Sequence, residues 1–456
     1  MRAYSIALVT LLAVVRCVVA ETSPAPNFVL ILADDMGWND AGFCGNHSVD
    51  TPHLDQLAKR GVVFAEACAS APNCAPTRAC LLTGLYPPRH GVYTVVDDRH
   101  KPGSPHHKLL AANSLEGLPT RFETLAEALK TRGYQTGMFG MWNLGRGRSG
   151  PETPTGQGFD VFTEPKELGF AKDAYRDSAG RYSPDALTDA ALQWMESVKQ
   201  RPFFLYLPFH DVHAPFDPKP ELLKKYQTRQ VADPELSATV EAMDANIGKV
   251  IAALEKAGVA GRTYIIFTSD NGGSRRTVSP LRGGKGTLYQ GGVRVPAIAA
   301  GPGIKPGVSR AVTLSMDWFP TVLELAGQKA PSSSDGRSLV PLLRNPAEKL
   351  ERPVFWHFPC YIGGGGPVSA IRQGNWKLIQ QFESGTAELY DLDTDPGEQH
   401  DLASAQPKKA AELLAALKAW QAETRTALPT KPNPAYDPSA VPERGRDARR
   451  KQKAGP

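Results

Sequence analysis

A short apolar run that stops at two acidic residues constrains the fold of this 456-residue chain most strongly. Residues 27–33 read NFVLILA, are rich in branched side chains, and end abruptly at Asp34 and Asp35. A run this short and this continuously apolar is typical of a fully buried strand. Residues 202–208 (PFFLYLP) and 263–268 (TYIIFT) repeat the pattern, and the second of these is followed by Ser-Asp-Asn. Buried strands with polar residues at their carboxyl ends are therefore expected at the centre of the fold.

Helical patterns alternate with these strands along the chain. Apolar residues recur at helical spacing in residues 52–60, 122–131, 185–200 and 237–256, and strand-like segments occupy residues 62–65 and 136–141. Strands that alternate with helices predict a doubly wound α/β sandwich. Ligands in such folds gather beyond the carboxyl ends of the strands, so the acidic residues found there mark a site.

The pattern changes near residue 345. Short strand-like segments separated by turns follow at residues 354–358, 369–372, 376–381 and 388–392, and one helical segment follows at 407–424. They predict a small antiparallel sheet packed by one helix. The expected organisation is a large domain at residues 26–345, this antiparallel-sheet subdomain at 346–427, and a basic, disordered tail at 428–456.

The N-terminus has the layout of a signal peptide. Arg2 precedes an apolar stretch at residues 6–15, and small residues end at Ala20. A retained membrane anchor is the alternative, but Arg16 interrupts the run and the stretch is short for a hydrocarbon layer of about 30 Å. We therefore expect a signal peptide at residues 1–20 and an exported protein, periplasmic or extracellular. No later segment is long and apolar enough to span a membrane.

Composition excludes two broad classes of protein. Apolar residues make up 41% of the chain and charged residues 22%, which is typical of a soluble globular protein rather than a disordered or membrane protein. The net charge of +5 comes mostly from residues 444–453 (RGRDARRKQK), so the rest of the chain is nearly neutral. A nucleic-acid binder needs a basic face on its folded body, and none is recognisable here.

The number of cysteines suggests that one of them is chemically special. The sequence has six, and Cys17 leaves with the expected signal peptide. An odd number remains, which in an exported protein points to one reactive or modified cysteine. Disulfide pairing and buried free thiols stay open for Cys44, Cys68, Cys80 and Cys360.

Three separate pieces of chain carry potential metal ligands. Asp34 and Asp35 follow the first strand, Asp270 and Asn271 follow a later strand, and Cys74 lies in an expected loop between them. Carboxylate and amide oxygens are suited to a hard cation such as Ca²⁺ or Mg²⁺. Isolated acidic pairs often serve only as turn formers, but two such pairs after buried strands favour a metal site.

The pentapeptide from Cys74 to Arg78 (CAPTR) resembles the modification signal of the formylglycine-dependent sulfatases, in which the cysteine is oxidised to an aldehyde. The resemblance covers residues 27–402. It is carried further by ADDMGW at 33–38, TPHLD at 51–55, TSDNGG at 268–273, LRGGKG at 281–286, GGVRVP at 291–296, WKL at 376–378 and ELYDL at 388–392.

This resemblance implies a fold, an activity and a set of residue roles. The fold would be an alkaline-phosphatase-like α/β/α sandwich, with the catalytic sulfatase domain at residues 26–345. The activity would be hydrolysis of sulfate esters, on a sulfated carbohydrate or an aryl sulfate. The modified Cys74 would be the nucleophile and a ligand of the cation, and Arg78 would hold it. His213 and Lys285 match the positions that contact the sulfate and the leaving oxygen. A formylglycine-generating enzyme would be the maturation partner.

The chain departs from the family pattern at one place near the expected site. Residues 140–145 read GMWNLG where the family usually reads GKWHLG. Met141 carries no charge, and Asn143 forms hydrogen bonds but does not act as a base at neutral pH. Cys360 also stands where relatives often carry histidine. These changes are expected to leave the fold and metal binding intact and to reduce turnover.

Two alternatives to an active sulfatase remain from the sequence. A noncatalytic relative that binds sulfated glycans is favoured by Met141 and Asn143, whereas the retained Cys74 and Arg78 count against it. A phosphoryl-transfer enzyme of the same superfamily is less favoured, because such enzymes more often have threonine or serine as the nucleophile.

Overall fold

A computed structural model describes residues 25–95, 103–145, 149–171, 174–273, 278–362 and 365–440 of the protein. Its centre is an eight-stranded sheet with the strand order β5-β4-β6-β1-β7-β8-β2-β9. The strands are β1 (Asn27–Ala33), β2 (Val62–Phe64), β4 (Gln135–Phe139), β5 (Val161–Thr163), β6 (Phe203–Pro208), β7 (Thr263–Ser269), β8 (Ala297–Ala300) and β9 (Gly307–Ser309). The first five strands in this order, β5, β4, β6, β1 and β7, are parallel to one another. Strand β8 is antiparallel to both of its neighbours, β7 and β2.

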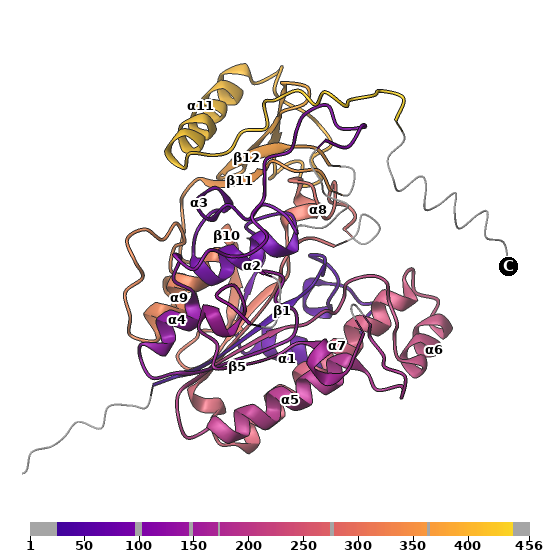
Figure 1. The fold of residues 1–456 in the computed structure, drawn as a ribbon, viewed down its shortest axis with the longest axis vertical. Helices are drawn as coiled ribbons and strands as arrows, with labels where there is room; N and C mark the ends of the chain where they lie inside the picture. Colours follow the sequence, from indigo (N-terminus) through magenta and orange to yellow (C-terminus); the bar gives the residue numbers. More distant parts are fainter. Residues whose placement is uncertain are drawn as a thin grey trace, which may run out of the picture.

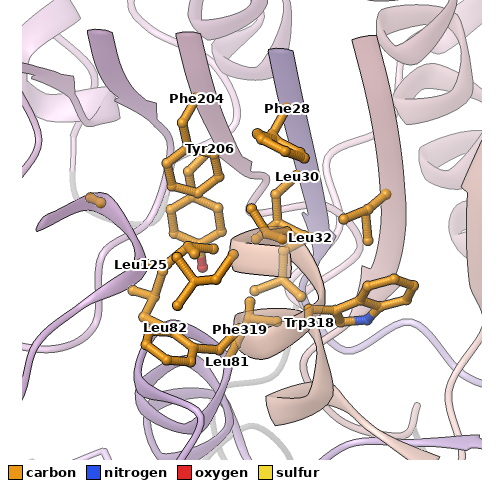
Figure 2. Packing of buried hydrophobic residues seen from close by; sticks show 14 of the residues in the cluster. Phe28, Leu30, Leu32, Leu81, Leu82, Leu125, Phe204, Tyr206, Trp318 and Phe319 are labelled. Carbon is orange, nitrogen blue, oxygen red and sulfur yellow. The ribbon is translucent and has the colours of Figure 1, made fainter. Parts of the chain in front are cut away.

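The central strands are buried on both faces, as their continuous apolar sequences predicted. Every residue of β1 and β6 is buried. Phe28, Leu30 and Leu32 point to one face, and the intervening residues of β1 pack on the other. Figure 2 shows how the first set meets the side chains of Leu81 and Phe319, which come from helices on that face.

Helices cover both faces of the sheet (Figure 1). One face packs against α2 (Cys74–Thr83), α4 (Leu125–Lys130) and α9 (Trp318–Leu325). The other packs against α1 (Pro52–Lys59), α5 (Ser183–Val198) and α7 (Pro234–Lys256). Shorter helices are α3 (Pro87–His90), α6 (Pro220–Thr228), α8 (Gln290–Val293) and α10 (Val340–Arg344). Turns of 3-10 helix occupy Gly42–Cys44, Thr155–Gln157, Pro165–Leu168, Ala260–Arg262 and Ser315–Asp317. The predicted three-layer α/β/α sandwich is confirmed.

A separate four-stranded antiparallel sheet forms the C-terminal part of the structure. Its strands follow one another in sequence order as β11 (Val354–Phe358), β12 (Val368–Gln373), β13 (Trp376–Gln381) and β14 (Ala387–Asp391). Helix α11 (Pro407–Glu423) packs against it through Leu413, Leu417 and Trp420. The predicted small sheet with one helix is therefore present, with each bound within one residue of expectation. A two-stranded ladder joins β3 (Ala67–Cys68) to β10 (Thr313–Leu314).

Two local predictions are wrong. Cys74 was expected in a loop, but it is the first residue of α2. Pro76 obscures this helix in the sequence, yet it lies in the first turn, where its missing N–H has no helical partner to lose. The disordered tail was expected from residue 428, but residues 428–440 belong to the described structure. Within them, Lys431 and Asn433 exchange backbone hydrogen bonds with Leu110 and Lys108. Residues 441–456 and the expected signal peptide at 1–20 lie outside the described residues.

The five cysteines within the described ranges are all free thiols, so the pairing left open by the sequence does not occur there. Among the helices that the structure describes, none is both long enough and apolar enough to cross a membrane.

Candidate active site

Two neighbouring central strands bring together the carboxylates that follow them, at the carboxyl ends of the strands. Strands β1 and β7 pair in register up to Ala33 and Ser269, so the residues that follow each strand meet. The backbone amide of Asp35 donates a hydrogen bond to Asp270 Oδ1 at 3.2 Å. Asp35 has a φ of +64°, a left-handed conformation that is uncommon outside glycine and is frequent at functional sites.

Cys74 joins these carboxylates from the N-terminus of α2. Its Sγ atom lies 3.3 Å from Asp34 Oδ1 and 3.5 Å from Asn271 Oδ1. One possible ligand atom from each of Asp34, Asp35, Cys74 and Asp270 lies within 4.8 Å of all the others. Burial, together with the carboxylates of Asp270 and Asp34, raises the pKa of the Cys74 thiol well above its ordinary value. These surroundings favour the neutral thiol over the thiolate.

Arg78 lies one helical turn after Cys74 and points to the same side of α2. Its Nε and Nη2 atoms donate to Asp270 Oδ2 at 3.1 and 2.9 Å, and Nη2 also donates to Asp34 Oδ2 at 3.0 Å. The Arg78 side chain is 0% exposed. Burial alone would raise the pKa of Asp34, but the positive charges around it, Arg78 first and then His213 and Lys285, together outweigh burial and lower the pKa to about 2.

One guanidinium does not compensate both carboxylates. Burial and the neighbouring charge of Asp34 raise the pKa of Asp270 to about 7, although Arg78 opposes the shift. A divalent cation would stabilise the ionised form of Asp270, because it adds positive charge among oxygen ligands. The Nδ2 atom of Asn271 donates to Asp35 Oδ1 at 2.7 Å, so its Oδ1 faces the cluster as a further oxygen ligand. This donor set fits a hard cation.

Lys285 and His213 complete the cluster from two loops. Lys285 Nζ lies 2.6 Å from Asp35 Oδ1 and 3.3 Å from Cys74 Sγ. His213 Nε2 lies 3.6 Å from Asp35 Oδ2, and its side chain is 35% exposed. Because His213 is the more accessible of the two, it faces the open side of the site. The structure thus brings together all the residues that the sequence placed in the site: Asp34, Asp35, Cys74, Arg78, His213, Asp270, Asn271 and Lys285.

Comparisons with known proteins agree with this arrangement. The sulfatase family model matches residues 26–328, and the C-terminal model of N-sulphoglucosamine sulphohydrolase matches residues 284–426. The chain belongs to the sulfatase family. Human arylsulfatase A is 33% identical to this sulfatase over 87% of each chain. Mouse N-acetylgalactosamine-6-sulfatase is 31% identical, with 86% of this chain and 79% of that one aligned.

Solved structures confirm the alkaline-phosphatase-like fold. The crystal structure of Ps i-CgsB in complex with k-i-k-neocarrahexaose superposes with a TM-score of 0.73 at 27% identity, covering 95% of this sulfatase and 98% of that chain. The predicted class of activity is confirmed by these relatives: the protein is a sulfuric ester hydrolase.

The segment that departs from the family pattern runs directly beside Arg78. The Met141 backbone amide donates to the Pro208 carbonyl at 2.8 Å, and its carbonyl accepts a short hydrogen bond from Arg78 Nη1. Asn143 is half-buried and has a φ of +58°. The backbone of Met141 is therefore tied to the cluster of this sulfatase through Arg78.

His357 and His210 are candidates to replace the histidine that the family carries at position 143. His357 is 1% exposed, and its ring nitrogens bond to Ser369 Oγ at 2.7 Å and to the Ala427 carbonyl at 3.2 Å. Both nitrogens are engaged in the C-terminal part of the structure, one by a residue of β12 and the other by a residue that follows α11, so His357 is not part of the cluster. His210 lies beside the cluster, with its ring centroid 5.3 Å from that of His213.

Two tyrosines that support this histidine pair were not predicted from the sequence. Tyr175 Oη donates to the backbone carbonyls of His213 at 2.9 Å and His210 at 3.2 Å. Tyr182 stacks on Tyr175 and donates to Asp211 Oδ1 at 3.3 Å. These tyrosines lie in an irregular segment without periodicity, so only a structure reveals their contacts.

Proposed function

We propose that this sulfatase hydrolyses sulfate esters of carbohydrates with a formylglycine nucleophile made from Cys74 and a divalent cation. The observation that carries the proposal is the position of Cys74 Sγ, in contact with Asp34, Asn271 and Lys285 at 3.3 to 3.5 Å. A cysteine that only packs in a core does not require a carboxylate, an amide and an ammonium group around its sulfur atom. The raised pKa of its thiol also argues against catalysis by the unmodified thiolate.

The cation would be held by Asp34, Asp35, Asp270, Asn271 and the modified Cys74 side chain. Oxygen ligands of this kind suit Ca²⁺, and Mg²⁺ is the alternative. When bound, the cation would neutralise charge on the sulfate oxygens and orient the ester.

The chain's own residues would then carry out the two half-reactions. One hydroxyl of the hydrated aldehyde at Cys74 attacks sulfur and displaces the alcohol, and Arg78 holds this hydroxyl in place. Lys285 and His213 contact the sulfate and the leaving oxygen, and one of them supplies the proton to the alcohol. The second hydroxyl would then lose its proton, the carbonyl would re-form as the carbon–oxygen bond to sulfate breaks, and addition of water would restore the hydrated aldehyde.

Met141 and Asn143 would slow the second half-reaction. The family lysine and histidine at these positions would bridge the sulfate and accept the proton of the second hydroxyl. An amide does not accept it, and general-base assistance is typically worth about 10²- to 10⁴-fold in rate. His210, whose ring centroid lies 5.3 Å from that of His213, is the histidine that we propose as a substitute base.

The substrate class rests on the relatives. One is an N-acetylgalactosamine-6-sulfatase, and another was crystallised with k-i-k-neocarrahexaose. Export through the signal peptide at residues 1–20, maturation by a formylglycine-generating enzyme, and the division into a catalytic domain at 26–345 and a subdomain at 346–427 belong to the same proposal.

The test is the Cys74→Ser variant, with Cys80→Ser as a matched control on the same helix. A serine oxygen accepts sulfate but has no second hydroxyl to expel it. Incubation with an aryl sulfate should leave Cys74→Ser folded, inactive and covalently sulfated on residue 74, as read by mass spectrometry. The control should turn over like the parent. Equal turnover by Cys74→Ser would show that no formylglycine is needed.

A noncatalytic glycan-binding protein is the second candidate, and the Met141 and Asn143 changes favour it. It predicts that a chain with Cys74 fully converted binds sulfated glycans but releases no sulfate and forms no sulfo-enzyme. The first half-reaction alone therefore separates the two functions.

A further inference from the structure

A lysine and a glutamate form an ion pair inside the C-terminal sheet with no exposure to solvent. Lys377 lies on β13, and Glu398 follows β14 in the chain. Lys377 Nζ is 2.8 Å from Glu398 Oε1, and both side chains are 0% exposed. Glu398 also has a left-handed φ of +53°. A charge pair buried this completely loses its hydration, so packing alone does not account for it.

Glu398 reaches from this pair to a loop of the large domain. Its second carboxylate oxygen accepts a hydrogen bond from the backbone amide of Gln290 at 2.5 Å. Its main-chain carbonyl accepts another from Arg282 Nη1 at 3.1 Å. Arg282 and Gln290 are the two ends of the segment 282–290. Glu398 therefore holds both ends of one loop.

The same loop carries Lys285 near its middle, where Nζ lies 2.6 Å from Asp35 Oδ1 and 3.3 Å from Cys74 Sγ. The glycines on either side have left-handed φ values, +87° at Gly283 and +85° at Gly286. A loop of this kind has no helix or strand ladder of its own to fix its shape. The main-chain amides of Lys285 and Gly286 donate to the carbonyls of Gly273 and Pro72 at 3.1 and 2.8 Å, and the attachments at the two ends of the loop add to these contacts in setting the position of the Lys285 side chain.

Packing attaches the loop to the C-terminal sheet as well. Leu288 and Val293 belong to the same apolar cluster as Trp356 of β11 and Leu378 of β13. Figure 1 shows α8, which begins at the end of this loop, beside that sheet. The loop is thus an extension of the C-terminal core.

We propose that Lys377 and Glu398 are positioning residues for Lys285. The ammonium of Lys377 fixes one oxygen of the Glu398 carboxylate, which leaves the other oxygen aimed at Gln290. These contacts hold the two ends of the loop in place, and with them the Lys285 amine beside the Asp35 carboxylate. The C-terminal sheet would thus be required for the chemistry of the site and not only for stability. The inference rests on the proposed role of Lys285 at the sulfate.

A double-mutant cycle tests this coupling. The kcat and KM for an aryl sulfate are measured for the parent, Lys377→Met, Lys285→Ala and the double variant, at a temperature where circular dichroism shows all four folded. A misplacement of about 1 Å costs about 100-fold in rate, so Lys377→Met should lower kcat/KM by about that factor. In the Lys285→Ala background the same change should cost less than about 3-fold, since there is no longer an amine to misplace.

Two further variants keep the test decisive. Arg282→Met removes the other anchor from a side chain that is 40% exposed, so it should fold even where Lys377→Met does not, and it should show the same coupling to Lys285. Arg372→Met breaks a different ion pair between the C-terminal sheet and the large domain, 3.0 Å from Glu66, and should lower stability without coupling.

Equal losses in the parent and Lys285→Ala backgrounds would overturn the positioning role alone. Parent-like activity of Lys285→Ala would instead overturn the proposed role of Lys285 itself, and the inference with it.

Discussion

Arg78 should be the most costly single residue to lose from the cluster. Its guanidinium makes three charged hydrogen bonds of 2.9 to 3.1 Å to Asp34 and Asp270, with no exposure to solvent. Replacing it by methionine keeps most of the volume but leaves two buried carboxylates uncompensated. Breaking a buried pair from one side typically costs about 3–5 kcal/mol. Arg78→Met should lower the free energy of unfolding by about that amount in the absence of metal.

Arg78→Lys is the matched control. A lysine ammonium keeps the charge but does not reproduce the planar fork that reaches Asp34, Asp270 and the Met141 carbonyl together. Loss of one charged hydrogen bond is worth about 1.5–3 kcal/mol, so the lysine variant should lie between the parent and Arg78→Met.

Urea unfolding followed by circular dichroism, with and without a chelator, measures both variants. The m value should stay unchanged while the midpoint falls, because the unfolded surface is the same. Added Ca²⁺ should stabilise Arg78→Met more than the parent, since the cation replaces the missing charge. A loss below about 1 kcal/mol for Arg78→Met, at unchanged m, would refute the conclusion that Arg78 compensates the buried charge of Asp34.

Three further predictions follow from the site and the core. Asp270→Asn should weaken cation binding, seen by calorimetry as a rise in Kd, because a small ligand shell loses a charged member; an unchanged Kd would place the cation elsewhere. Met141→Lys combined with Asn143→His should raise kcat by about 10²- to 10⁴-fold over the parent if proton removal limits turnover, with Cys74 fully converted in both proteins; no gain would mean that another base accepts the proton. Burial lowers the pKa of His90 to about 3 from its ordinary 6.5, so the unfolded chain binds a proton first as the pH falls. The free energy of unfolding should therefore drop by about 1 kcal/mol between pH 7.5 and 5.5 in the parent relative to His90→Gln, and equal slopes in urea titrations would contradict this.

The sheet could be predicted from the sequence because its central strands are apolar on both faces. Strands β1, β6 and β7 lie within one residue of the predicted bounds. Short edge strands such as β5 and β9 were missed, since a segment of three residues with an exposed side has no distinguishable period. Their pairing is fixed by neighbouring strands rather than by their own sequences.

The residues of the site were predictable for a different reason. Asp34 and Asp270 end buried strands that pair in register, so their proximity follows from the topology. The supports of the site were not predictable. Tyr175 acts through a side-chain hydroxyl on main-chain carbonyls, and Glu398 acts on Gln290 from 108 positions away in the sequence. Contacts between residues so far apart in the sequence leave no local sequence pattern.

The proposed mechanism makes activity dependent on conversion of Cys74 to an aldehyde. Trypsin releases residues 61–78 as one peptide, which also contains Cys68 as an internal thiol control. The protein is produced with and without a formylglycine-generating enzyme, and the mixtures are assayed for sulfate release under saturating aryl sulfate. Specific activity should be proportional to the fraction of peptide that carries the aldehyde at residue 74, and it should reach zero when that fraction is zero. Equal activity in protein whose Cys74 remains a thiol would contradict it.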